Sequence, residues 1–127
     1  MHKKSYLGLA IAWTLFMLFL CLEDSNDLPK IKIQNLDKFV HASFHFVFVV
    51  IWFLYIRISK DSIHNKVRIK KVFWFSVLFG ISIEFLQYFF TTTRKADVFD
   101  VFANIIGAIL AVLAVQLWNN KQKSKTL

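Results

Sequence analysis

Four long apolar runs limit what this chain can fold into more than any other feature of its sequence. They make up most of a chain that is 57% hydrophobic and contains 15 Phe. Each run is close to the roughly 20 residues that an α-helix needs to cross a hydrocarbon core of about 30 Å. A soluble four-helix bundle would carry a polar stripe along each helix, and segments such as FVFVVIWFLYI show none on the side that would face lipid. The sequence therefore predicts an all-α, four-helix transmembrane bundle. The expected helices cover about 6–22, 38–58, 72–90 and 98–118.

The length of 127 residues predicts a single membrane domain, 1–127. The first apolar run follows a short basic stretch, as in a signal peptide, but no small-residue cleavage site follows it. We therefore expect an uncleaved first helix. Cys21 is the one cysteine, so no disulfide can form within the chain.

The basic residues are distributed unevenly between the two sides of the predicted bundle. Eleven of the 16 Lys and Arg residues fall near the chain ends or between the second and third helices, and five fall on the opposite side among acidic residues. The positive-inside rule therefore places both termini and the segment 59–71 in the cytoplasm. We attribute the net charge of +8 to topology and to contact with anionic lipids, and we expect no nucleic-acid binding. We also expect 59–71 to be a loop and the tail after Asn119 to be disordered.

Small residues recur at every fourth position in three of the predicted helices, a spacing that lets helix backbones approach closely in lipid. They are Gly8 and Ala12 in the first helix, Ser76 and Gly80 in the third, and Ala103, Gly107 and Ala111 in the fourth. The spacing predicts close packing and by itself says little about function.

Polar residues interrupt the apolar runs in the half of the predicted membrane opposite the basic segments. They are Asp37, Lys38, His41 and His45 in the second helix, Glu84 and Gln87 in the third, Arg94 in the connection, and Asp97, Asp100 and Asn104 in the fourth. Spacings of three or four residues place most of those in each helix on one face. Because a lone charge in hydrocarbon is costly, these faces should meet one another or a water-filled cavity. We predict one extracytoplasmic polar pocket, with these ten residues as candidate ligand-binding residues.

Several of the candidates also have a purely structural interpretation. Asp97 has the position of a helix N-cap, with Asp100 three residues later, where the helix dipole favours a carboxylate. Asp37 has a similar relation to the second helix. Gln87 and Asn104 suit hydrogen bonds between helices as well as they suit ligand contact.

Glu84 most needs a partner, because its neighbours are apolar and a carboxylate there must be paired or hold a proton. Arg94 is either that partner or a free clamp for an anion. We expect a hydrogen bond, directly or through one water, from Glu84 to at least one member of a set of nearby polar side chains. The set is Gln87, Arg94, Asn104, His41 and His45.

His41 and His45 are four residues apart, a spacing that places two imidazoles on one helix face, and Glu84 or Asp100 could complete a metal site with them. The surrounding sequence, HASFH, lacks the glutamate of a metallopeptidase helix. One such pair is a weak signal, and His41 also has the position of an interfacial histidine. We therefore expect no metal ion and no cofactor.

These residues also carry a family resemblance. The stretch DKFVHASFHF, then E-x-x-Q, then R-x-x-D-x-x-D-x-x-x-N-x-x-G resembles the VanZ-like family of small bacterial integral membrane proteins. The positions that match the family's motif are Asp37, Lys38, His41, Glu84, Gln87, Arg94, Asp100, Asn104 and Gly107. His45 and Asp97 are less characteristic of it. A second small residue often follows the glycine, and here it is Ala111.

The resemblance implies a bacterial inner (plasma) membrane, a role in the cell envelope and a link to teicoplanin resistance, the theme of the family's namesake. Together with the polar pocket, it leads us to expect binding or modification of an anionic envelope lipid or cell-wall precursor. If the protein is an enzyme, which the sequence leaves open, His41 and Glu84 are the acid–base candidates and Arg94 the charge stabiliser. The alternative is a structural or assembly module without a ligand.

Overall fold

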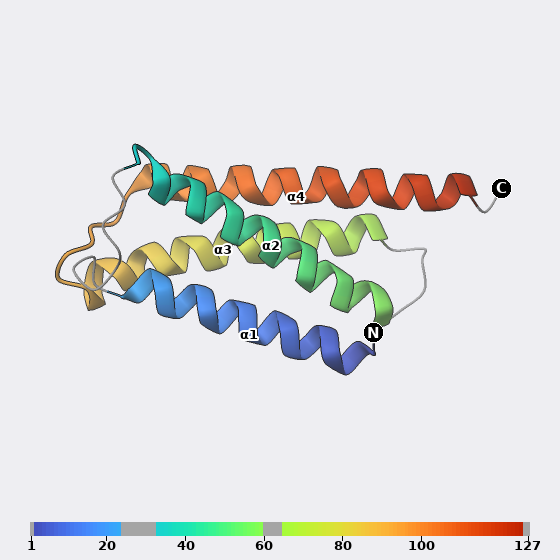
Figure 1. Ribbon diagram of the computed structural model, residues 1–127, viewed down its shortest axis with the longest axis horizontal. Helices are drawn as coiled ribbons and strands as arrows, with labels where there is room; N and C mark the ends of the chain where they lie inside the picture. Colours follow the sequence, from blue (N-terminus) through green and yellow to red (C-terminus); the bar gives the residue numbers. More distant parts are fainter. Residues whose placement is uncertain (1, 24–32, 60–64, 126–127) are drawn as a thin grey trace.

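The computed structural model describes residues 2–23, 33–59 and 65–125, which form four α-helices without a strand among them (Figure 1). The helices are α1 (Lys3–Leu22), α2 (Leu36–Ser59), α3 (Asn65–Phe90) and α4 (Val98–Lys125). The prediction of an all-α chain with four long apolar helices is confirmed. Most of the segment between the first two helices, 24–32, lies outside the described residues.

Two helix boundaries differ from the predictions. The third helix begins at Asn65 rather than near residue 72, and the fourth continues to Lys125 rather than ending near residue 118. The expected loop over 59–71 is therefore wrong for 65–71, and the expected disordered tail after Asn119 is wrong for 120–125. Both extensions are rich in Lys, with Arg68 in the first and Gln122 in the second, and these three residue types are good helix formers. Hydropathy marks where a helix leaves hydrocarbon, and these helices continue into the polar region beyond it.

The two ends of the bundle differ in chemistry. At one end, α1 and α3 finish and α2 and α4 begin, and the polar candidates gather there; we call it the polar end (Figure 1). The opposite end holds both termini, the finish of α2 and the start of α3. Its basic residues include Lys3, Arg57, Lys66 and Lys70, so we call it the basic end.

The surface of the helices is apolar over most of its area. All four helices are long and apolar enough to cross a membrane. Large apolar side chains point outward from each of them, for example Phe19 at 63% exposure, Phe85 at 63% and Phe102 at 56%. A soluble monomer rarely exposes so large an apolar surface. The chain is thus a multi-pass membrane protein.

The helices pack around a narrow core, in which α2 and α4 make the most extensive contact. Met17, Phe48, Val72 and Ala108 contribute one buried side chain from each helix. A second buried group, nearer the basic end, contains Phe53 from α2, Ile69 from α3 and Val115 from α4.

Small residues set the closest helix approaches, but only in part as predicted. At Gly107 in α4 a Cβ atom would overlap the backbone carbonyl of Ala42 in α2, whose carbonyl carbon would lie 2.7 Å away. Gly80 in α3 faces the His45 ring, which a Cβ atom would approach to 3.0 Å. Gly8 in α1 is different, because a Cβ atom there would have nothing within 4 Å and the residue is exposed. The packing interpretation of the α1 glycine is therefore wrong.

We predict opposite outcomes for the same substitution at two glycines. Gly107→Ala should destabilise the bundle by about 3 kcal/mol or more, because the neighbouring backbone cannot yield as a flexible side chain would. Gly8→Ala is the matched control and should be neutral or slightly stabilising, since Ala is the better helix former. Thermal unfolding in detergent measures both, and equal stability of the two variants would contradict the α2–α4 contact.

Candidate functional site

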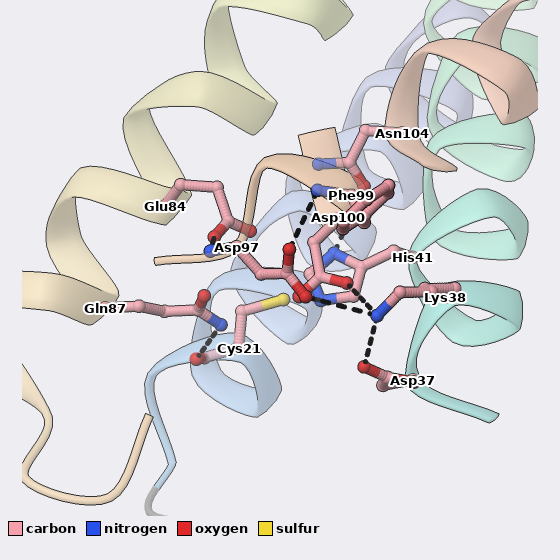
Figure 2. Close-up of polar contacts among 10 residues, drawn as sticks. All are labelled: Cys21, Asp37, Lys38, His41, Glu84, Gln87, Asp97, Phe99, Asp100 and Asn104. Carbon is pink, nitrogen blue, oxygen red and sulfur yellow. Dashed lines mark hydrogen bonds and ion pairs between the residues drawn. The ribbon is translucent and has the colours of Figure 1, made fainter. Parts of the chain in front are cut away.

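The polar end is organised around the ammonium group of Lys38 (Figure 2). Its Nζ lies 3.0 Å from Asp37 Oδ2, 3.2 Å from Asp97 Oδ2 and 3.3 Å from Asp100 Oδ1. Asp37 is the most exposed of the three carboxylates and Asp100 the least, with 58% and 11% of their side chains accessible. Lys38 is therefore already paired, and it leaves this part of the site with an excess of negative charge.

Asp97 caps the N-terminus of α4, as its position in the sequence indicated. Its Oδ1 accepts a hydrogen bond from the N–H of Phe99 at 2.8 Å. The pKa of Asp97 lies below its ordinary value, first because this N–H stabilises the charged form and further because Lys38 lies beside it, while partial burial acts in the opposite direction. Asp97 thus combines the predicted capping role with an ion pair to Lys38.

His41 occupies the buried floor below this ion-pair network. Its Nδ1 lies 3.1 Å from Asn104 Oδ1 on α4, so the ring N–H donates to the amide oxygen. Its Nε2 lies 3.7 Å from Asp100 Oδ2. Asp100 therefore faces Lys38 with one oxygen and His41 with the other.

Glu84 reaches the same floor from α3, and it is 5% exposed. Its Oε2 accepts a hydrogen bond from the backbone N–H of Asp97 at 3.0 Å. Its Oε1 is buried and has no hydrogen-bond partner within the described part of the chain. The partner we expected was one of five side chains, and among the described residues the direct partner is a backbone group instead. Glu84, His41 and Asp100 each place one oxygen or nitrogen within 4.8 Å of the others.

Gln87 and His45 tie the helices together around the cluster. Gln87 Nε2 donates to the carbonyl of Cys21 at 2.7 Å, which fastens α3 to the last turn of α1 (Figure 2). His45 lies one turn deeper than His41, and its Nδ1 is 2.7 Å from Ser76 Oγ on α3. Both side chains are almost fully buried.

Arg94 lies in the connection between α3 and α4, three residues before Asp97. The hydroxyl of Thr91 donates to the carbonyl oxygens of Gln87 and Arg94, at 2.7 and 3.2 Å, and so holds the start of this connection. The Nε of Arg94 is buried and lacks a hydrogen-bond partner among the residues described.

Side-chain contacts thus place nine of the ten predicted residues at the polar end or one turn below it, and Arg94 lies in the connection beside them. Sequence reasoning missed Cys21 and Ser76 as hydrogen-bonding partners. The carbonyl of Cys21 could not have been predicted, because every residue has a backbone carbonyl. Ser76 could have been, because it lies four residues before Gly80 and eight before Glu84, on the same helix face.

An open groove of about 530 Å³ lies elsewhere, between α3 and α4 in the basic half. Ile69, Phe73 and Val112 line it, and Lys66 and Lys70 also border it. It is about 20 Å along α3 from Glu84, at 1.5 Å per residue. The predicted pocket at the polar end therefore stays a prediction.

The fold and the cluster define a class: a multi-pass membrane protein of four helices whose polar residues converge at one end. Within that class, the family model described as VanZ/LLP1 matches residues 5–119, which is most of the chain. The chain belongs to the VanZ/LLP1 family, and the resemblance drawn from its motifs is confirmed. Comparisons with curated proteins and with solved structures found no match.

We expect Asp97→Ala to lower the free energy of unfolding by about 1 kcal/mol, because it removes a helix cap. Asp97→Asn keeps a capping side chain and loses only the charge, so its effect should be smaller. Thermal or denaturant unfolding in detergent distinguishes the two variants.

The same residue predicts a pH dependence. Because its folded-state pKa is lowered, the contribution of the Asp97 charge is present above the ordinary carboxyl pKa and is lost as the pH falls through the lowered value. The stability difference between the wild type and Asp97→Asn should therefore shrink below about pH 4. A difference that stays constant as the pH falls further would contradict the lowered pKa.

Proposed function

We propose that the polar end binds the headgroup of an anionic envelope lipid or of a lipid-linked cell-wall precursor. The observation that carries this proposal is that three of the four buried polar atoms without partners among the described residues lie together at the polar end: Glu84 Oε1, Arg94 Nε and Asn104 Nδ2. The fourth, Asn119 Oδ1, lies at the basic end. Buried polar groups in folded proteins are nearly always hydrogen-bonded. A network that only held the helices together would be expected to satisfy its own members.

Arg94 is the residue that we assign to the anionic part of the headgroup. Lys38 is unsuited to this role, because three carboxylates already surround its ammonium group. A guanidinium group can bind a phosphate through two parallel hydrogen bonds, and it keeps its charge when buried.

Access from the lipid phase supports a lipid-linked ligand. Large apolar side chains surround the polar end on its outer surface, including Phe39 at 77% exposure, Phe90 at 75% and Phe99 at 67%. Acyl or prenyl chains would lie against these side chains in the bilayer, while the anionic part of the headgroup reaches Arg94. The protein would then bind lipid from one leaflet of the bilayer.

The orientation and the membrane are part of the same proposal. The basic end would be cytoplasmic under the positive-inside rule, which places the polar end at the outer leaflet of the bacterial cell membrane. The teicoplanin-resistance theme rests on family membership alone and stays a prediction for this chain.

An enzyme acting on the headgroup is the second candidate, and a specific observation favours it. His41 and Glu84 have polar atoms within 4.8 Å of each other, close enough to contact one substrate group. Sequence spacing could not show this proximity, because the two residues belong to different helices. A structural or assembly module remains the alternative if no ligand is found.

We expect Arg94→Ala to reduce the amount of anionic lipid that copurifies with the protein by about 10-fold or more, since a charge-assisted contact is lost. Native mass spectrometry of protein purified in mild detergent measures the bound lipid. Lys70→Ala is the matched control, because Lys70 borders the groove in the basic half. Lipid that is lost in the Lys70 variant and retained in the Arg94 variant would reject the proposal.

We expect Glu84→Gln to fold like the wild type, because the amide oxygen still accepts the Asp97 N–H, and to abolish any conversion of the headgroup. Circular dichroism checks the fold, and mass spectrometry of bound lipid after incubation checks the conversion. Unchanged turnover in this variant would remove Glu84 from the chemistry, and turnover in neither protein would favour binding over catalysis.

A further inference from the structure

We propose that His41, Glu84 and Asp100 hold a divalent transition-metal cation, of the Zn²⁺ or Mn²⁺ type, at the buried floor of the polar end. One imidazole and two carboxylates form a mixed nitrogen and oxygen donor set. The three ligands come from three different helices, α2, α3 and α4, so the site exists only in the assembled bundle.

The geometry of the three residues fits a shared ion. One potential ligand atom from each lies within 4.8 Å of the other two, and all three residues are buried. His41 Nε2 and Asp100 Oδ2 are 3.7 Å apart, too far for a good hydrogen bond. Two ligands of one ion, each at about 2.0–2.2 Å from it, are separated by roughly 3–4 Å. Small side-chain adjustments would therefore bring the three ligands onto one ion, with water or a bound ligand in the remaining coordination position.

A second, independent observation points to a ligand at this place. Glu84 is 5% exposed, and its Oε1 has no hydrogen-bond partner in the described ranges, although its Oε2 is fixed by the Asp97 N–H. An unpaired carboxylate oxygen in a buried site is costly. A cation between Glu84 and Asp100 would satisfy this oxygen and also reduce the repulsion between the two carboxylates.

His41 is oriented as metal-binding histidines are. Its Nδ1–H donates to Asn104 Oδ1, which leaves the lone pair of Nε2 directed toward the carboxylates. The Asn104 amide is in turn held closely against α3, because a Cβ atom at Gly80 would lie 2.8 Å from its Nδ2. Asn104 is thus a positioning residue for the histidine.

The neighbouring group of Asp37, Asp97 and Asp100 is a poorer choice for the ion. Its three carboxylates also lie within 4.8 Å of one another, but the ammonium of Lys38 already contacts all three. Lys38 instead serves the proposed site by holding one oxygen of Asp100, so that the other faces His41.

This donor set differs from the histidine pair that the sequence brings to mind. His45 contacts Ser76 through its Nδ1 and lies one turn deeper, so the proposed site keeps His41 and both carboxylates weighed from the sequence, Glu84 and Asp100, and leaves His45 out. The metal site does not depend on lipid binding, whereas any coordination of an anionic headgroup by the ion rests on the proposed function.

The test is metal analysis of the protein purified in detergent without chelator, followed by chelation and titration with Zn²⁺ or Mn²⁺. We expect one tightly bound ion per wild-type chain. Glu84→Gln, Asp100→Asn and His41→Gln should each weaken binding by about 100-fold or more, since each removes a ligand. His45→Gln is the matched control, because His45 lies one turn deeper and contacts Ser76, and it should bind the metal as the wild type does.

Three results would overturn the proposal: no stoichiometric binding of either ion to the wild type, wild-type affinity in Glu84→Gln, or an equal loss in His45→Gln and His41→Gln. Size-exclusion chromatography and circular dichroism confirm folding, and Glu84→Gln decides the matter if the His41 variant does not fold. Metal binding without copurified anionic lipid would reject the proposed function and retain the metal site. Lipid binding without a bound metal would reject the metal site and retain the proposed function.

Discussion

The close approach of α2 and α4 at Gly107 is the contact on which the rest of the structure depends. The backbone of Ala42 occupies the space that any side chain at this position would need. His41 precedes Ala42 in the chain, and Asn104 lies one turn from Gly107, so the same approach brings their side chains within hydrogen-bond distance. Dispersion and hydrogen bonds drive helix association in lipid, because the hydrophobic effect between helices is absent there. Gly107 therefore determines both how closely α2 and α4 pack and how the His41 and Asn104 side chains meet at the polar end.

Burying so many polar groups in an apolar bundle requires partners from every helix. Backbone groups supply two of them: the carbonyl of Cys21 accepts from Gln87, and the N–H of Asp97 donates to Glu84. Both lie at helix ends, where backbone groups have no partner within their own helix. The polar end is thus built where the helices begin and finish, because backbone groups without an intrahelical partner are available there to side chains.

Much of this could be predicted from the sequence, and the failures have physical causes. Apolar length gave four helices, and the spacing of Glu84 and Gln87 placed them correctly on one buried face. The partner of Glu84 was missed because it is a backbone N–H, and every residue except proline has one, so the sequence does not mark which N–H will be used. The Gly8 interpretation failed because spacing identifies a smooth helix face without showing whether another helix covers it. Helix ends were misplaced because hydropathy reports the membrane boundary, and helix formation continues past it.

Asp100 joins two regions that otherwise have little in common. One of its oxygens belongs to the solvent-accessible ion pairs of Lys38 and the other to the buried histidine. A single rigid carboxylate cannot rotate toward one without turning from the other. Displacement of Lys38 from Asp100 would therefore change the charge balance around His41, one helical turn further along α2.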